Sequence, residues 1–312
     1  MLQYLVILLD DTSVSYCHYE NPRTERKLIA WDDLKTGILF AMKENLMIQF
    51  VYPDYELPQE YKDAIEDIDH SKIMPASCSD KANVAVFDGW DALSTYTFDK
   101  ETAYVLRTSK TDFFKHCAEL ESVLPKASRL NIVLTDVENF TDADFDKYES
   151  TLKRLADKLK DLYGKGNTPQ LNLLTDRMML DKMNNCNAGW ENITLAPNGK
   201  FYVCPAFYQE EAYPIGDLQS GLYIKNPQLY RLDHAPLCRH CDAYQCKRCV
   251  WLNQKTTLEV NTPSHEQCVT AHLERNVART LLYDIRKAGT FLPDKEIKEI
   301  DYLDPFEVRK EF

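Results

Sequence analysis

The sequence predicts an α/β protein in which an open or partial parallel barrel precedes a cysteine-rich module, stabilised by bound metal, and a closing helix. Three observations predict this fold. Short apolar runs alternate with amphipathic stretches over residues 1–180, the pattern of parallel βαβ units. Seven of the ten cysteines fall between Cys186 and Cys268. Helical periodicity then returns over 268–289 and stops at Gly289.

The elements of the first 180 residues follow from their residue patterns. Apolar runs predict strands over 4–9, 47–52, 82–88, 102–107, 129–134 and 171–175. Amphipathic stretches predict helices over 31–46, 58–69, 111–124 and 142–163, the last with Thr141 or Asp142 as its N-cap and with Gly164 and Gly166 at its end. Six strands are too few for an eight-stranded barrel, which favours an open or partial one with right-handed crossovers.

The length of the chain and the change in residue composition along it predict three structural parts. With 312 residues, of which 44% are hydrophobic, the chain can form one large domain and an appended module. We expect the barrel over 1–180, the cysteine-rich module with its closing helix over 181–290, and a charged tail over 291–312.

Charge and hydropathy exclude several classes of partner. The formal net charge is −12, and Lys and Arg are scattered, which argues against nucleic acid. The N-terminal apolar run lacks the flanks of a signal peptide, and no apolar stretch is long enough to span a membrane. We therefore expect a cytoplasmic protein without membrane contact, in which clustered cysteines are reduced thiols or metal ligands rather than disulfides.

The cysteines of the second half have the spacing of metal ligands. Closely spaced thiols in a reducing compartment bind metal because a short loop can direct two sulfurs at one site. Twelve residues separate the first cysteine from Gly199, and the central block CRHCDAYQCKRC has gaps of two, four and two residues. The candidate ligands are Cys186, Cys204, Cys238, Cys241, Cys246, Cys249 and Cys268.

This arrangement resembles the SPASM extension of radical SAM enzymes. That extension has a first cysteine, a glycine, a cysteine shortly after it, a C-x2-C-x5-C-x3-C block and a last cysteine. The phrases CNAGWENITLAPNGKFYVC and YPIGDLQSGLYIKNPQLYRL are similar to its first segment and its connector. Two gaps in the block are each one residue shorter here, but no ligand is missing. The resemblance covers residues 183–290.

The resemblance implies two four-iron, four-sulfur clusters. By position, Cys186, Cys204 and Cys249 would bind one cluster, and Cys238, Cys241, Cys246 and Cys268 the other. The first cluster then lacks a fourth cysteine, so its open iron could take a substrate thiolate or amine, Asp242 or His240. Zinc in place of the clusters remains the alternative.

The radical SAM site is degenerate by the same comparison. Such enzymes need C-x3-C-x2-C directly after the first strand, where this chain has DDTSVSYCHYENP, with Asp10, Val14 and Cys17 at the three ligand positions. The family's glycine-glycine-glutamate loop would fall in QFVYPDYELP, which contains no glycine. S-adenosylmethionine is therefore not expected as a cofactor. Cys17 is left as a solitary thiol, and Cys78 and Cys117 are interpreted as ordinary thiols.

The whole chain is similar to pseudo-radical-SAM/SPASM proteins, especially the CXXX-repeat peptide maturase family. This resemblance implies an iron–sulfur protein of a ribosomal-peptide maturation (RiPP) system that binds and presents a cysteine-containing precursor peptide, alongside a separate modifying enzyme. Two alternatives remain open. One is a true peptide-modifying enzyme that uses its clusters for electron transfer or Lewis-acid chemistry, and the other is a zinc-stabilised interaction module.

Overall fold

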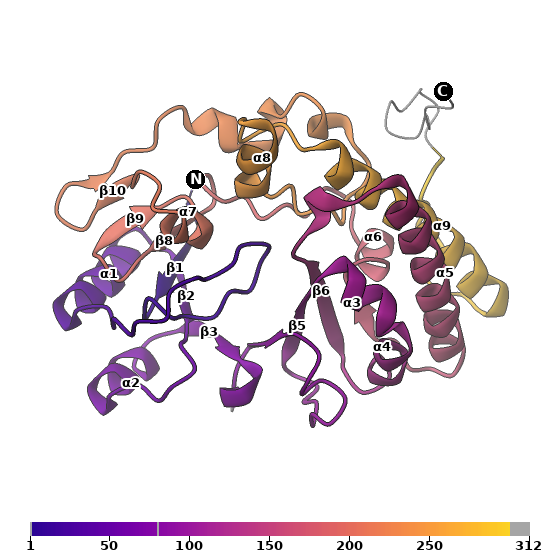
Figure 1. Ribbon diagram of the computed structural model, residues 1–312, viewed down its shortest axis with the longest axis horizontal. Helices are drawn as coiled ribbons and strands as arrows, with labels where there is room; N and C mark the ends of the chain where they lie inside the picture. The colour runs from indigo at the N-terminus through magenta and orange to yellow at the C-terminus, as the bar shows by residue number, and fades with distance from the viewer. Residues whose placement is uncertain (1, 80, 300–312) are drawn as a thin grey trace.

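Eleven strands within the described residues, 2–79 and 81–299, form one open sheet in the computed structural model (Figure 1). The strand order is β11-β10-β9-β8-β1-β2-β3-β4-β5-β6-β7. The strands are β1 (Tyr4–Leu8), β2 (Met47–Val51), β3 (His70–Pro75), β4 (Val84–Asp88), β5 (Ala103–Thr108), β6 (Arg129–Leu134), β7 (Gln170–Leu171), β8 (Asn192–Leu195), β9 (Lys200–Tyr202), β10 (Gly216–Asp217) and β11 (Gly221–Leu222).

The barrel half is the parallel part of this sheet. Strands β1 to β7 pair in parallel and in sequence order. Leu5, Val6, Ile7 and Leu8 of β1 are buried, as expected for a parallel strand covered on both faces. The mixed α/β architecture with a large parallel sheet confirms the coarse fold class expected from the sequence.

The helices lie between the strands in the sequence, and α9 is the last helix of the described residues. In Figure 1, α5 and α9 run side by side, and the two helices are in contact. None of the helices in the described part of the chain is both long and apolar enough to cross a bilayer. The helices are α1 (Trp31–Lys43), α2 (Gln59–Glu66), α3 (Lys110–Lys115), α4 (Cys117–Val123), α5 (Asp142–Gly164), α6 (Thr175–Met179), α7 (Pro205–Gln209), α8 (Val250–Thr257) and α9 (His265–Ala288).

One strand was not expected, and two expected elements differ in the structure. Strand β3 was not expected, because the sequence HSKIMP is half polar and ends in proline. The helix expected over 111–124 is divided into α3 and α4 at His116. The strand expected over 171–175 is reduced to β7, because the side chain of Asn172 replaces further backbone pairing: its Oδ1 accepts from the N–H of Ile132 (2.7 Å) and its Nδ2 donates to the Ile132 carbonyl (2.9 Å).

The cysteine-rich segment continues the same sheet. Strand β8 pairs in parallel with β1, with Tyr4 opposite Asn192. Strands β8 and β9 form an antiparallel hairpin, in which Gly199 has φ +73°; this conformation favours glycine. The turn directs the chain back through β9 to Cys204, the N-cap of α7. From residue 300 onward, the tail expected over 291–312 lies outside the described residues.

Helix α5, which supports α9, begins at a charged network. The Asp144 carboxylate accepts hydrogen bonds from the backbone N–H (3.0 Å) and hydroxyl (2.7 Å) of Thr141 and pairs with Lys110 (2.8 Å). The Lys110 contact, followed by the Thr141 hydrogen bond, lowers the pKa of Asp144 to about 2. The pKa of this carboxyl is lower in the folded protein than in the unfolded chain, where it is about 3.9. The ionised Asp144 side chain therefore stabilises the folded protein at pH values above about 3.9.

Asp144→Asn is therefore expected to lower the free energy of unfolding by about 1 kcal/mol at pH 7, the usual value of such a helix-terminal contact. The difference between variant and wild type should shrink as the pH falls from about 4 towards 2, where the wild-type carboxylate becomes protonated. Urea unfolding of both proteins at pH 7 and pH 3 measures it. A difference that is the same at both pH values would contradict this assignment.

Candidate metal centres

The segment between β1 and α1, residues 9–30, is called here the post-β1 loop. In Figure 1 this indigo segment reaches from β1 towards the middle of the molecule, below α8. It contacts the carboxyl ends of two other strands: Val14 donates its N–H to the Tyr52 carbonyl after β2 (2.9 Å), and His18 Nδ1 is 2.8 Å from the Leu134 carbonyl oxygen at the end of β6. The carboxyl ends of parallel strands are where barrel enzymes carry their active sites.

Asp10 and Val14, which stand at two of the three ligand positions, have structural contacts. Asp10 is fully buried. Its carboxylate accepts hydrogen bonds from the Thr12 N–H (2.8 Å), the Thr12 hydroxyl (2.6 Å) and the Tyr55 hydroxyl (2.9 Å). The Asp10 carboxylate therefore shapes the loop, and Val14 has no ligating atom. The residues present do not fit a cluster that binds S-adenosylmethionine.

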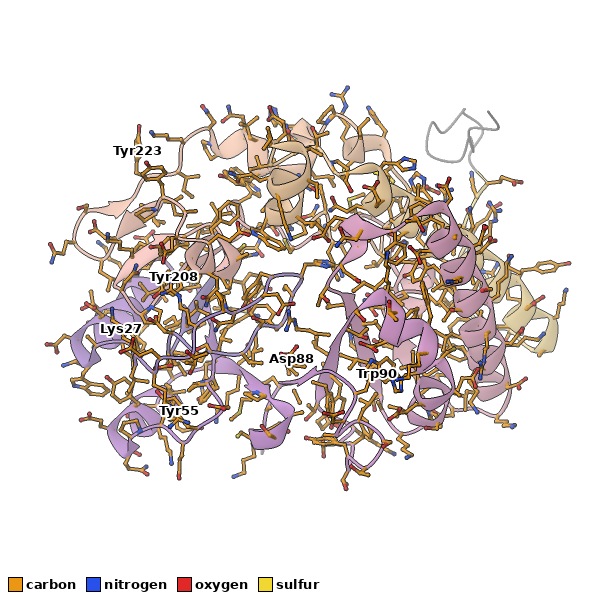
Figure 2. The ribbon with its side chains drawn as sticks, viewed as in Figure 1. Lys27, Tyr55, Asp88, Trp90, Tyr208 and Tyr223 are labelled. Carbon is orange, nitrogen blue, oxygen red and sulfur yellow. The ribbon has the colours of Figure 1, made fainter. Side chains whose placement is uncertain are left out.

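Arg107 on β5 holds the part of the loop that carries Cys17. This arginine is 2% exposed. Its Nε donates to the Cys17 carbonyl (3.0 Å), and its Nη2 donates to the Tyr19 carbonyl (2.7 Å). The guanidinium also pairs with Glu20 (2.9 Å) and with Asp88 at the end of β4 (2.5 Å), which is labelled near the centre of Figure 2. Three of these contacts join one planar side chain to residues 17–20 of the loop and hold that part of it against β5.

The first group of expected ligands, Cys186, Cys204 and Cys249, is brought together by the fold. The N–H of Cys186 donates to the Lys247 carbonyl (3.0 Å), which places it beside the segment that leads to Cys249. Cys204 and Cys249 are the N-cap residues of α7 and α8. Burial, and then the charge of Cys186, raise the pKa of both thiols well above the usual range. The three thiols are therefore electrostatic neighbours.

Cys17, on the post-β1 loop, lies within electrostatic range of Cys186. Burial and the charge of Cys186 raise its pKa to about 12, and the charges of Arg107 and Lys247 oppose that rise. Its charge in turn acts on Cys204 and Cys249. By contrast, Cys117 is buried in the main core, and Cys78 Sγ lies 3.5 Å from the Asp54 carbonyl oxygen, as ordinary thiols.

The second group has the local geometry of thiolate ligands. Backbone N–H groups two residues further along donate to sulfur, from Ala243 to Cys241 Sγ and from Arg248 to Cys246 Sγ, both at 3.4 Å. Such N–H donors stabilise a thiolate and tune a bound cluster. Burial raises the pKa of Cys246 to about 12, and the charges of Cys238 and Cys241 add to this effect.

Helix α9 brings the last expected ligand to the second group. Cys268 lies in its first turn, four residues before His272, so both residues share one helix face. His272 Nε2 is 3.6 Å from Cys241 Sγ. The structure thus places Cys238, Cys241 and Cys246 near one another. Cys268 lies on the same face of α9 as His272, which contacts Cys241.

Cationic side chains lie near both groups, although the chain is acidic overall: Arg248 is buried and Lys247 is half-buried. Lys247 lies within range of Cys186 and Cys17, and Arg248 within range of Cys238. Arg248 is 2% exposed, and its Nε and Nη1 are buried without a hydrogen-bond partner among the described residues. Unpaired buried guanidinium N–H groups are costly. An anionic cluster beside Cys238 would compensate that cost, so the donor set fits an iron–sulfur cluster.

Asp242 and His240, the expected alternatives for the open iron, belong to the surroundings of the second group. The Asp242 carboxylate accepts a hydrogen bond from Arg275 (2.9 Å) and faces Arg177 (3.8 Å). His240 is exposed, within the segment between Cys238 and Cys241. Among the described residues, no three His, Cys, Asp or Glu side chains converge on the position of one metal ion. A four-iron cluster needs a wider arrangement, because each thiolate binds a different iron.

Sequence reasoning missed Arg107, Lys247 and Arg248. One signal was present for Arg107, because it is a charged residue near the end of the otherwise apolar strand AYVLRT. Lys247 and Arg248 stand inside the cysteine block itself, in the CKRC phrase, where a charge that compensates bound thiolates is useful.

Comparison with known proteins gives likenesses of fold. No protein-family model matches the sequence, and no curated protein matches it. Among solved structures, native anSMEcpe with bound AdoMet and Cp18Cys peptide superposes with a TM-score of 0.64 at 12% identity, over 92% of this chain and 100% of that one. Native anSMEcpe with bound AdoMet and Kp18Cys peptide gives a TM-score of 0.62 at 12% identity, over 91% of this chain and 99% of that one.

A structure of Streptococcus suis SuiB bound to precursor peptide SuiA gives a TM-score of 0.50 at 13% identity, over 84% of this chain and 75% of that one. These neighbours are radical SAM/SPASM peptide maturases. The resemblance of the whole chain is therefore confirmed at the level of the fold: the chain is similar in fold to radical SAM peptide maturases.

Proposed function

We propose that this chain is an iron–sulfur protein of a ribosomal-peptide maturation system, which binds and presents a cysteine-containing precursor peptide without radical SAM chemistry of its own. One observation carries the proposal. In a radical SAM-like fold, the post-β1 loop offers one thiol where three are needed, and Asp10 and Arg107 tie that loop across the carboxyl ends of the strands. The fold is kept, while the S-adenosylmethionine site is replaced by structural contacts.

The metal part of the proposal concerns residues 181–290 as a SPASM-like module. Cys186, Cys204 and Cys249 would hold one four-iron cluster, and Cys238, Cys241, Cys246 and Cys268 the other. The N–H donors to sulfur and the buried guanidinium of Arg248 support this assignment. When bound, such clusters supply folding free energy and a route for single electrons. The alternatives are an enzyme that uses the clusters chemically and a zinc-stabilised interaction module.

The peptide part of the proposal is supported by the neighbours of known structure. One was solved with a Cp18Cys peptide and one with the precursor peptide SuiA. In this chain, a hollow of about 390 Å³ lies between the post-β1 loop and the segment that follows β9. Lys27, Tyr208 and Lys200 line it; Figure 2 labels the first two. Because α7 carries both Tyr208 and the N-cap Cys204, a peptide in this hollow would lie beside the first cysteine group.

The reduced protein is expected not to cleave S-adenosylmethionine, because Asp10 and Val14 stand where thiolates must hold the cofactor-binding cluster. Incubation with dithionite and S-adenosylmethionine, followed by chromatography for 5′-deoxyadenosine, measures this. Cys17→Ala is the control for any signal. Production of 5′-deoxyadenosine above background by the wild type, abolished in that variant, would show that the chain performs radical chemistry.

Peptide capture separates the three alternatives. Anaerobically purified protein should retain a synthetic cysteine-containing precursor peptide and release it with unchanged mass. Lys27→Glu and Lys200→Glu, which reverse two charges that line the hollow, should weaken retention of this peptide, and Lys153→Glu on α5 should not. A peptide recovered with a changed mass would favour the enzyme. A colourless preparation with stoichiometric zinc would favour the interaction module.

A further inference from the structure

We infer that the hollow between the post-β1 loop and the segment that follows β9 binds the carboxylate of an acidic side chain of the peptide. Lys27 and Lys200 bind this carboxylate, and Tyr213 packs against the apolar residue next to it in the peptide. This assignment rests on the proposed function only in taking a peptide as the occupant. It adds the chemical feature by which that peptide is selected.

The walls of the hollow come from segments that are far apart in the sequence. The post-β1 loop supplies Arg23 and Lys27, strand β9 supplies Lys200, and the chain after α7 supplies Tyr213. Figure 2 shows the Lys27 and Tyr208 labels on the same side of the molecule. The volume of about 390 Å³ is at the small end of the range for ligand pockets. It suits one or two side chains of a peptide.

The floor of the hollow is polar and held in place. Tyr208 and Asp11 are 4% and 7% exposed, and the Tyr208 hydroxyl donates to the Asp11 carboxylate. Arg23 donates from Nε to Gln209 Oε1 (3.0 Å), and its guanidinium carbon lies 4.5 Å from the centre of the Tyr208 ring. Among the described residues, Arg23 pairs with one carboxylate, that of Asp11, at 3.8 Å. The positive charge of Arg23 is therefore only partly compensated.

Lys27 and Lys200 bring two further positive charges to the walls. Both residues are exposed, and neither forms a salt bridge within the described part of the chain. Asp217, opposite Lys200 on β10, accepts the N–H groups of its own turn, from Gln219 (2.8 Å) and Ser220 (2.6 Å). These cations meet in a chain whose formal net charge is −12. The hollow is therefore a local site of attraction for an anion.

The rim of the hollow presents an uncovered aromatic ring. Glu211 has φ +56°, and the Ala212 N–H returns to the Phe207 carbonyl (2.9 Å), so that the chain turns outward at the end of α7. Tyr213 follows this turn and is 96% exposed. A ring of this size gains free energy when an apolar side chain covers it. An apolar residue beside the acidic one in the peptide would do so.

The surroundings favour a single carboxylate over a polyanion. Asp11 and Glu211 also line the hollow, and the rest of the chain is acidic, so a nucleic acid would be repelled outside the hollow. One carboxylate satisfies the two lysines without this repulsion. It is also an anion that a peptide carries without modification.

Fluorescence anisotropy of short peptides with an uncharged label tests the inference on the anaerobically purified full chain. The acidic probe contains one glutamate followed by leucine, a cysteine elsewhere in its sequence and an amidated C-terminus. A second probe has glutamine in place of the glutamate. The wild type should bind the glutamine probe about three to ten times more weakly, as expected for loss of a partly enclosed charge contact. Added salt should weaken binding of the acidic probe more than that of the glutamine probe.

Variants of opposite sign separate recognition from damage to the fold. Lys27→Gln and Lys200→Gln should each weaken binding of the acidic probe about three to ten times and leave the glutamine probe unaffected. Glu211→Gln removes a repelling carboxylate and should tighten binding of the acidic probe, which a misfolded protein would not do. Tyr213→Ala should weaken binding of both probes to the same extent. Lys153→Gln on α5 is the matched control and should bind both probes as the wild type does.

Equal affinity of the wild type for the acidic and glutamine probes would overturn the inference, and so would wild-type affinity of both lysine variants for the acidic probe. A third probe, with the glutamine and a free C-terminal carboxylate, distinguishes the end of a peptide from an acidic side chain. If it binds as tightly as the acidic probe, the hollow reads the end of the chain and the side-chain assignment is wrong.

The inference and the proposed function can fail separately. Glutamate-dependent binding followed by recovery of a peptide with changed mass would support the carboxylate site and refute a role limited to binding and presentation. Tight binding of both amidated probes, with unchanged mass and no dependence on glutamate, would do the reverse. If the wild type binds none of the probes, both are refuted.

Discussion

Cys241→Ala is expected to lose about half of its iron, falling from about eight to about four atoms per chain, and to become largely insoluble. Cys241 lies at the centre of the second group: it accepts the N–H of Ala243, interacts with Cys238 and Cys246, and contacts His272 of α9. A metal centre contributes its binding free energy to folding when the unfolded chain lacks the site. Removing a ligand from a segment with few strands or helices should therefore unfold that segment.

Anaerobic expression, with iron and sulfide assayed in the soluble fraction, measures this effect. Cys78→Ala removes a thiol that hydrogen-bonds with the Asp54 carbonyl and the Ser77 hydroxyl, and it should keep both iron and solubility. The prediction fails if Cys241→Ala stays soluble with the wild-type iron content. It also fails if both variants lose iron equally, because the effect would then not depend on ligation.

Arg107→Met is expected to lower the free energy of unfolding by about 3 kcal/mol, because a buried guanidinium that bonds two carbonyls is replaced by a side chain without donors. Its carboxylate partners Glu20 and Asp88 have mostly exposed side chains, so they regain water and limit the loss. The Cys17 and Tyr19 carbonyls lose their donor, and the post-β1 loop should move. Urea unfolding in the absence of oxygen measures the change in the free energy of unfolding.

Two variants serve as comparisons for Arg107→Met. Arg107→Lys keeps the charge but lacks the planar fork that reaches both carbonyls, so it should be intermediate in stability. Arg154→Met removes the exposed pair with Glu121, which should cost at most about 1 kcal/mol. Equal stability of Arg107→Met and Arg154→Met would refute the anchoring role.

The barrel half could be predicted from the sequence where burial leaves a periodic pattern. Strand β6 matches the expected range 129–134, and α5 begins at Asp142 after Thr141 as expected. The pattern failed where a side chain takes over backbone pairing, as Asn172 does beside β6. It also failed at β3, because the sequence HSKIMP does not alternate apolar and polar residues.

The candidate site was predictable only where its ligands are close in sequence. The spacing of the block from Cys238 to Cys249 indicated metal binding, because short loops bring thiols together by themselves. Arg107 donates to the Cys17 carbonyl across 90 positions of the sequence, and no local pattern can report a contact over that separation.

The pairing of β8 with β1 has a consequence for biosynthesis. Strand β1 leaves the ribosome before β8, the strand that pairs with its second edge, which begins at Asn192, 188 residues after Tyr4. At the usual elongation rates this delay is roughly 10 to 40 s. During that time one edge of β1 has unpaired backbone groups that can pair with another nascent chain. Chaperone protection of the N-terminal half during translation should therefore raise the soluble yield more than extra iron supplied after synthesis.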